Sequence, residues 1–118
     1  MILPNADRAF IPIEKLKGYA LNLTHEKGMH KAIVFDEVLG YNTGNFEMLI
    51  SRIQEGIYKF PATFKGHTAY GDRYEIIMHI EGANGRTAKV VTGWIIDEET
   101  GFPRLTTAYI PKKVKKSL

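Results

Sequence analysis

The sequence predicts an α+β domain in which two to three N-terminal helices pack on one face of a four-stranded antiparallel sheet. Two observations lead to this fold class. Up to Tyr58 the apolar residues recur at helical spacing, and after Pro61 they alternate with polar residues, which is the period of a strand. The expected strands follow one another through short turns, so they form an antiparallel sheet of their own rather than alternating with helices.

The length and composition describe a single folded unit. A chain of 118 residues can bury one core, and we expect a domain over residues 1–111 followed by a basic tail over residues 112–118. There is no Cys, which excludes disulfides and thiolate chemistry. No apolar run approaches the roughly 20 residues of a membrane span, and the N-terminus does not resemble a signal peptide. These features predict a cytoplasmic protein without a membrane partner.

The net charge of +3 comes from the tail. The chain has 16 Lys and Arg against 13 Asp and Glu, and four of the lysines are Lys112, Lys113, Lys115 and Lys116. Without these four the remaining residues carry a charge of −1, so the sequence is not that of a generally basic nucleic-acid-binding protein. The tail is either a solvated end or an electrostatic contact to phosphates.

Three helices are expected in the first half of the chain. The first begins after Pro12, because proline suits the first helical position. Its buried stripe is expected at the apolar residues with helical spacing, Ile13, Leu16, Tyr19 and Ala20. The second is expected over MHKAIVFDEVL and ends at Gly40, since glycine suits the left-handed conformation of a helix C-cap. The third is expected over residues 44–58.

Four strands are expected in the second half. The first covers residues 62–68 and the second residues 73–80. The last two lie within residues 86–111, RTAKVVTGWIIDEETGFPRLTTAYIP, where β-branched and apolar residues dominate both arms. Between the second and third strands, Asn84-Gly85 predicts a tight hairpin turn.

This turn predicts which side chains share a face of the sheet. A two-residue turn pairs Met78 with Val91, and a four-residue loop keeps the same faces. One face then carries the apolar residues that should lie on the helices, Tyr74, Ile76, Met78, Val91 and Ile95. The free face carries Glu75, Ile77, His79, Val90, Thr92 and Trp94. Trp94 could stack a base and Glu75 or His79 could move a proton, although an ordinary solvated face has a similar composition.

The face of the last strand depends on the loop before it. A loop of five residues and a loop of six residues over residues 97–102 would put opposite faces of this strand beside the third one. Either Arg104 and Thr106, or Thr107 and Tyr109, therefore join Thr92 and Trp94.

Other kinds of site find little support. His25 and His30 have no Cys or carboxylate in zinc-ligand spacing, and no phosphate-loop glycine pattern is present. No metal and no cofactor is expected.

Three segments of the chain form a recognisable pattern: LPNADRAFIPIEKLKGY at the start, HEKGMHKAIVF in the middle, and NGRTAKVVTGWI with PRLTTAYIP at the end. They resemble a family of small bacterial proteins catalogued as a domain of unknown function. The resemblance spans nearly the whole chain. Its motif implies the following positions of interest: His25, Gly28, Lys31, Arg86, Trp94, Arg104, Thr107 and Tyr109.

The segments HEKGMHKAIVF and TTAYIP also resemble, more distantly, motifs of the barnase–EndoU–colicin–RelE group of RNase toxins. That group combines a His/Lys helix motif with a closing Thr-x-Tyr strand. Cleavage there needs a base for the ribose 2′-hydroxyl, an acid for the leaving oxygen and a cation for the phosphate. The resemblance implies that His25 or His30 is acid or base, that Lys31 and Arg86 hold the phosphate, and that Thr107 and Tyr109 complete the pocket.

Two alternative functions are therefore expected. The first is a metal-independent endoribonuclease of the toxin type, with RNA contacts at His79, Thr92, Trp94 and Arg104. The second, which the near-neutral body favours, is a non-enzymatic interaction module, such as an antitoxin or immunity partner or a catalytically silent relative. The nuclease mechanism requires that His25, Lys31, Arg86 and either Thr107 or Tyr109 meet at one end of the sheet.

Overall fold

A computed structural model of the protein describes residues 1–111. The helical elements come first: the 3₁₀ turn η1 (Ala6–Arg8), the short helix α1 (Ile13–Lys15), the π-helical turn η2 (Leu16–Ala20), and the helices α2 (Met29–Leu39) and α3 (Phe46–Lys59). The strands β1 (Ala62–Thr68), β2 (Gly71–Glu81), β3 (Thr87–Asp97) and β4 (Pro103–Tyr109) follow. The fold is α+β, as predicted. The predicted basic tail lies outside the described residues.

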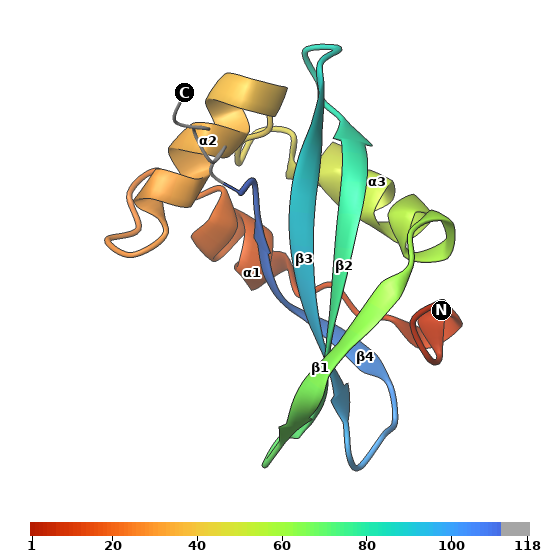
Figure 1. The fold of residues 1–118 in the computed structure, drawn as a ribbon. Coiled ribbons are helices and arrows are strands. Elements are labelled where there is room, and N and C mark those ends of the chain that lie inside the picture. Colours follow the sequence, from red (N-terminus) through yellow and green to blue (C-terminus); the bar gives the residue numbers. More distant parts are fainter. Residues whose placement is uncertain (112–118) are drawn as a thin grey trace, which may run out of the picture.

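The four strands form one antiparallel sheet in the order β1-β2-β3-β4. Each strand pairs with its neighbour in sequence, which short turns permit only between antiparallel strands. In Figure 1 the long hairpin of β2 and β3 runs the height of the molecule, and α2 and α3 lie to either side of its upper half. Within the described part of the chain, no helix is long and apolar enough to cross a membrane.

The first predicted helix is interrupted. It consists of the single turn α1, which continues directly into the π-helical turn η2. Leu16 and Ala20 are buried as predicted, but Ile13 is 51% exposed, so this part of the predicted stripe is wrong. A π-helical turn contains more residues than an α-helical turn. Residues on either side of it therefore no longer share one helical face.

The two longer helices follow their sequence signals. Helix α2 ends at Gly40, which adopts a φ of +71° and donates its N–H to the Asp36 oxygen. Helix α3 buries its apolar stripe, including Leu49 and Ile53, against the sheet. Both helix boundaries agree with the predictions to within two residues at each end.

The hairpin between β2 and β3 overturns the predicted faces. The turn takes five residues, 82–86, rather than two or four. An odd number shifts the pairing by one residue, so every side chain of β3 changes face. Trp94 lies opposite Tyr74, and Thr92 lies opposite Ile76, on the face that packs against the helices. The prediction that Trp94 and Thr92 lie on the free face, where they would contact RNA, is therefore wrong.

Contacts with the end of α2 explain the longer turn. The Asn84 backbone N–H donates to the Leu39 oxygen at 3.4 Å, and its side-chain Nδ2 donates to the Val38 oxygen at 3.1 Å. The Asn84 Oδ1 accepts the N–H of Arg86 at 3.0 Å. These tertiary contacts override the local preference of Asn-Gly for a two-residue turn.

The core contains a chain of buried hydrogen bonds around Trp94. The indole Nε1 donates to Thr92 Oγ1 at 2.9 Å, and Thr92 Oγ1 donates to the Ile76 oxygen at 2.8 Å. All three residues are buried. A polar group at this depth needs a partner, and Thr92 supplies one for the only tryptophan of the chain.

The face of the sheet opposite Trp94, which we call the outer face, carries a mixed set of side chains. They are Glu75, Ile77 and His79 on β2, Val91, Gly93 and Ile95 on β3, and Arg104, Thr107 and Tyr109 on β4. The register shift beside Gly93 inserts one extra residue into β4, a β-bulge. The bulge brings Arg104 and Tyr109 to the same face. Neither predicted alternative holds, because Arg104 and Tyr109 share the face opposite the one that carries Thr92 and Trp94.

Candidate functional site

The densest group of chemically useful side chains lies where the first turn of α2 meets the end of β4. Lys31 Nζ is 5.1 Å from the centroid of the Tyr109 ring and 5.5 Å from that of the Tyr19 ring. The His25 ring packs edge-on against Tyr19, with centroids 4.6 Å apart. We call His25, Lys31, Tyr19 and Tyr109 the Lys31 cluster. It joins three of the segments that the sequence analysis singled out.

The aromatic rings position the ammonium group of Lys31. A cation is attracted to the face of an aromatic ring, and Lys31 is half-buried between two of them. The N-terminal end of a helix carries a partial positive charge, which disfavours a lysine in the first turn. The two rings offset this effect. The same helix end and the same lysine would both attract an anion.

His25 caps the start of α2 with its side chain. Its Nδ1 accepts the backbone N–H of Lys27 at 3.1 Å and that of Gly28 at 3.0 Å. Two donors at Nδ1 require that the ring proton sits on Nε2. In this state the ring can donate a hydrogen bond but has no free acceptor. His25 is therefore suited to binding an anion, and the acid or base role that the sequence predicted does not fit its bonding.

The spacing of His25, Gly28 and Lys31 follows from this local geometry. A Cβ atom added to Gly28 would lie 2.6 Å from the Tyr19 oxygen, so the close approach of η2 to α2 requires glycine. Lys31 lies three residues further on, roughly one helical turn away on the same side. The three positions thus have different roles: His25 caps the helix, Gly28 permits the close contact with η2, and Lys31 provides a cation.

The first turn of α2 also has free backbone donors. Met29 donates its N–H to the backbone oxygen of His25, and Ala32 donates its N–H to the backbone oxygen of Gly28. Within residues 1–111, the N–H groups of His30 and Lys31 have no hydrogen-bond acceptor. Unpaired N–H groups at a helix N-terminus favour a bound phosphate or carboxylate. They add to the donors offered by the Lys31 and His25 side chains.

Arg86 lies away from this cluster. The turn that contains it contacts Leu39, at the C-terminal end of α2. Leu39 is eight residues beyond Lys31, which corresponds to about 12 Å along the helix axis. The geometry therefore gives no support to the prediction that Arg86 and Lys31 hold one phosphate together, and the mechanism proposed below does not use Arg86. His30 is also outside the cluster, because it is exposed and points about 100° around the helix from Lys31.

Next to Tyr109, the outer face carries two polar side chains around a glycine. Glu75 pairs with Gly93, and Gly93 pairs with Thr107. The Cα atoms of Glu75 and Thr107 are two strand spacings apart, roughly 9.6 Å. A Cβ atom added to Gly93 would lie 2.7 Å from Thr107 Cγ2, so the Thr107 side chain leans over the glycine. We call Glu75, Gly93 and Thr107 the Gly93 row. The sequence predicted that Glu75 lies on the free face, but not which residues of β4 lie beside it.

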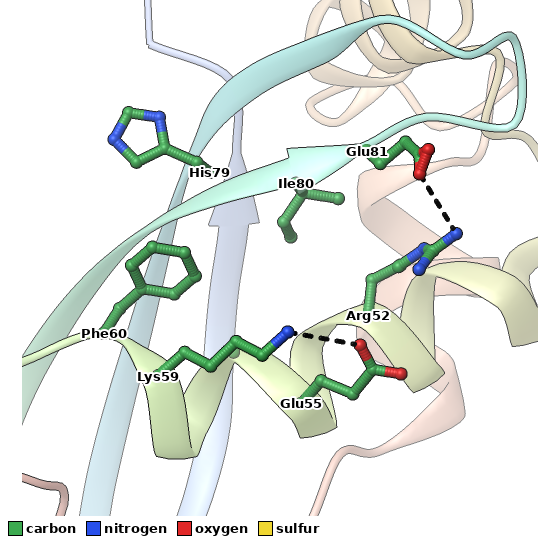
Figure 2. Close-up of a pocket in the computed structure, with 8 residues that line it drawn as sticks. Arg52, Glu55, Lys59, Phe60, His79, Ile80 and Glu81 are labelled. Carbon is green, nitrogen blue, oxygen red and sulfur yellow. Dashed lines mark ion pairs between the residues drawn. The ribbon is translucent and has the colours of Figure 1, made fainter.

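A separate hollow of about 230 Å³ lies between α3 and β2. Figure 2 shows its two ion pairs, Arg52 with Glu81 at 3.7 Å and Lys59 with Glu55 at 3.9 Å. A hydrogen bond to Tyr41 raises the pKa of Arg52, so this guanidinium stays charged at any physiological pH. Each cation in the hollow thus faces a carboxylate of the protein.

His79, which the sequence predicted to contact RNA, lies at this hollow. Its ring is exposed and its centroid is 5.8 Å from that of Phe60 (Figure 2). His79 pairs with Lys89 near the turn end of the hairpin. It therefore borders the paired charges of α3 rather than the Lys31 cluster.

Comparison with known proteins gives one match. The model of a protein family described as "Domain of unknown function (DUF6883)" matches residues 2–112, a range that includes every residue of the Lys31 cluster. No curated protein and no solved structure matches the chain.

Proposed function

The chain belongs to the DUF6883 family, and we propose that it is a metal-independent endoribonuclease of the toxin type that acts at the Lys31 cluster and the Gly93 row. The observation that carries the proposal is the position of Lys31 Nζ, 5.1 Å from the centre of the Tyr109 ring and 5.5 Å from that of Tyr19, the ring against which His25 packs. A phosphate-binding cation and hydroxyl groups next to a carboxylate are the parts that RNA cleavage needs in one place.

The chemistry needs no metal, because RNA carries its own nucleophile. The ribose 2′-hydroxyl loses its proton, and its oxygen forms a bond to the neighbouring phosphorus. The bond from phosphorus to the 5′-oxygen then breaks, and that oxygen gains a proton. The products are a 2′,3′-cyclic phosphate and a 5′-hydroxyl. The protein has to bind the phosphate, accept one proton and return one.

In this proposal Lys31 binds the phosphate and stabilises its extra negative charge in the transition state. The His25 Nε2–H and the free amides of α2 add hydrogen bonds to the same group. Lys31 also returns the proton to the leaving 5′-oxygen. The ribose lies on the outer face at the Gly93 row, where Glu75 accepts the proton of the 2′-hydroxyl and Tyr109 binds the sugar. We place this activity in the cytoplasm, where the RNA of a cell is.

The direct test is incubation of the pure protein with total RNA in the presence of EDTA. We expect internal cuts in RNA and none in single-stranded DNA, which has no 2′-hydroxyl. Intact RNA after incubation with an equimolar amount of folded protein would count against the proposal.

One observation favours a second function. Apart from its tail, the chain has a charge of −1, whereas RNA-binding surfaces are usually basic. A non-enzymatic partner, such as an antitoxin or immunity protein, has no need of a basic face. If this is the function, the tagged protein recovers one small companion protein in stable complex from cells of its source, and it leaves RNA intact.

A further inference from the structure

A patch of aromatic and basic side chains lies at the opposite end of β4 from the Lys31 cluster. It borders a hollow of about 290 Å³. Phe10 is 59% exposed and Phe102 is 40% exposed. The guanidinium carbon of Arg8 is 5.4 Å from the centroid of the Phe102 ring. We call Arg8, Phe10, Phe102 and Arg104 the aromatic patch.

The backbone at Phe10 is fixed although its ring faces solvent. Its N–H donates to the Pro103 oxygen at 2.8 Å, and its oxygen accepts the N–H of Leu105 at 2.9 Å. Nearby, Asn5 Nδ2 donates to the Gly101 oxygen at 2.7 Å and ties the N-terminal segment to the loop before β4. The rings are thus presented on a rigid frame. Clustered exposed apolar groups of this kind mark binding surfaces.

The aromatic patch and the proposed active site share the outer face. Arg104, Thr107 and Tyr109 all point to this face of β4 because of the bulge between them. From Arg104 to Tyr109 the strand advances about 16 Å. A single extended strand of nucleic acid lying along β4 would therefore reach both places.

Two carboxylates near the patch, those of Asp97 and Asp7, make local contacts. Asp97 lines the hollow, and its Oδ1 accepts the N–H of Glu99 at 2.7 Å and that of Thr100 at 3.3 Å. Asp7 lies 3.9 Å from Arg8, and both side chains are mostly exposed. An exposed pair at this distance is weak, so a phosphate can compete for Arg8.

We propose that the aromatic patch binds single-stranded nucleic acid and, as a part that rests on the proposed function, holds the RNA that flanks the cleaved bond. Bases stack on Phe10 and Phe102, because stacking on aromatic rings tolerates any base. Arg8 and Arg104 bind the adjoining phosphates. The patch would thus hold the substrate along β4 while the Lys31 cluster acts on it.

The test separates binding from cleavage by using a strand that cannot be cut. The probe is a fluorescein-labelled single strand of about ten 2′-O-methyl uridines, a length suited to one small binding domain, and binding is followed by fluorescence anisotropy at several salt concentrations. Phe10→Ala should weaken binding about tenfold or more without changing the salt dependence. Arg8→Ala with Arg104→Ala should lower the slope of log K against log salt by about 1.4, since each phosphate contact on a single strand contributes about 0.7.

Conservative variants and distant controls sharpen the result. Phe10→Trp keeps an aromatic face and should bind as the parent does, whereas Phe10→Leu keeps only an apolar side chain and should bind weakly. Tyr58→Ala on α3 and Lys65→Ala on β1 remove an exposed aromatic ring and an exposed cation elsewhere, and they should have no effect. Melting curves confirm that each variant is folded.

Each outcome decides something. If the Phe10 and arginine variants bind the strand as tightly as the parent, the aromatic patch is not a nucleic-acid site. If the parent binds through Phe10 but does not cut RNA, the patch stands and the proposed nuclease function fails. If the Phe10→Ala variant cuts RNA as fast as the parent, the nuclease function stands and the patch does not hold the substrate. If the parent does not bind the strand, the proposal is overturned. A co-purified protein that the parent retains and Phe10→Ala loses would then identify the patch as a protein interface.

Discussion

Lys31 and Tyr109 meet across the junction of α2 and β4, with Lys31 Nζ 5.1 Å from the centroid of the tyrosine ring. The contact joins a cation near the start of a helix to the last residue of an edge strand. Tyr109 shares the outer face of the sheet with the Gly93 row, which includes Glu75 and Thr107. The proposed active site depends on this contact.

Two substitutions of Tyr109 separate its ring from its hydroxyl. Tyr109→Phe keeps the ring under Lys31 but loses the hydroxyl that contacts the reacting ribose, so it should lower the cleavage rate about tenfold or more and weaken binding less than Tyr109→Ala does. Tyr109→Ala also removes the cation–π contact, worth about 0.5–2 kcal/mol, and should weaken affinity as well. Single-turnover cleavage and strand binding measure the two effects. Equal cleavage rates for Tyr109→Phe and the parent would show that the Tyr109 hydroxyl takes no part in the reaction.

Glu75→Gln should slow RNA cleavage by about 10²–10⁴-fold, the usual contribution of a general base. The amide has nearly the same shape as the carboxylate but cannot accept the proton. His79→Ala serves as the control, since His79 lies beside Phe60 and the paired charges of α3. A Glu75→Gln variant that cuts RNA at the parent's rate would show that the proton goes elsewhere.

The bonding of His25 predicts a structural effect. His25→Ala removes the acceptor for two N–H groups at the start of α2 and should lower the free energy of unfolding by about 1 kcal/mol, as for other helix caps. Urea denaturation measures this loss. His30→Ala, one turn further on and exposed, should change it by less than about 0.5 kcal/mol. The account of His25 is wrong if the two variants are equally stable.

The buried hydrogen bonds of Trp94 can be tested in the same way. Thr92→Val removes the hydroxyl and leaves the Trp94 Nε1 without its buried acceptor, which should cost about 1–3 kcal/mol. Thr92→Ser keeps the hydroxyl and should cost less. Trp94 is only 1% exposed, so its fluorescence should be almost insensitive to iodide. Strong quenching in the folded protein would instead support the predicted exposed, base-stacking tryptophan.

The sequence predicted those elements whose signals are local. The limits of β1 follow from the change of period after Pro61, and the end of α2 follows from the ability of Gly40 to adopt a positive φ. These features depend on a few neighbouring residues. Tertiary contacts can still override them, as at η2, where a π-helical turn moves Ile13 out of the buried stripe.

Features that depend on distant contacts were not predictable in the same way. The faces of β3 depend on whether its turn has an even or odd number of residues, and Asn84 decides this by bonding to Leu39 and Val38. The placement of Arg86 follows from the same turn. The sequence did place Glu75 on the free face and singled out His25 and Lys31, but that Thr107 and Tyr109 share the face of Glu75 became evident only once the register and the bulge in β4 were known.

The most direct test of the proposed function is the cleavage of a DNA strand that contains a single ribonucleotide, in EDTA, by the parent protein, Lys31→Ala and Lys27→Ala. Lys27 is an exposed lysine four residues before Lys31 and controls for the loss of charge. We expect one cut after the ribonucleotide, a 2′,3′-cyclic phosphate on the product, the parent's rate for Lys27→Ala, and a rate about 10²–10³-fold lower for Lys31→Ala. An uncut strand with the parent protein, or equal rates for the two lysine variants, would contradict the assignment of this cluster as a ribonuclease site.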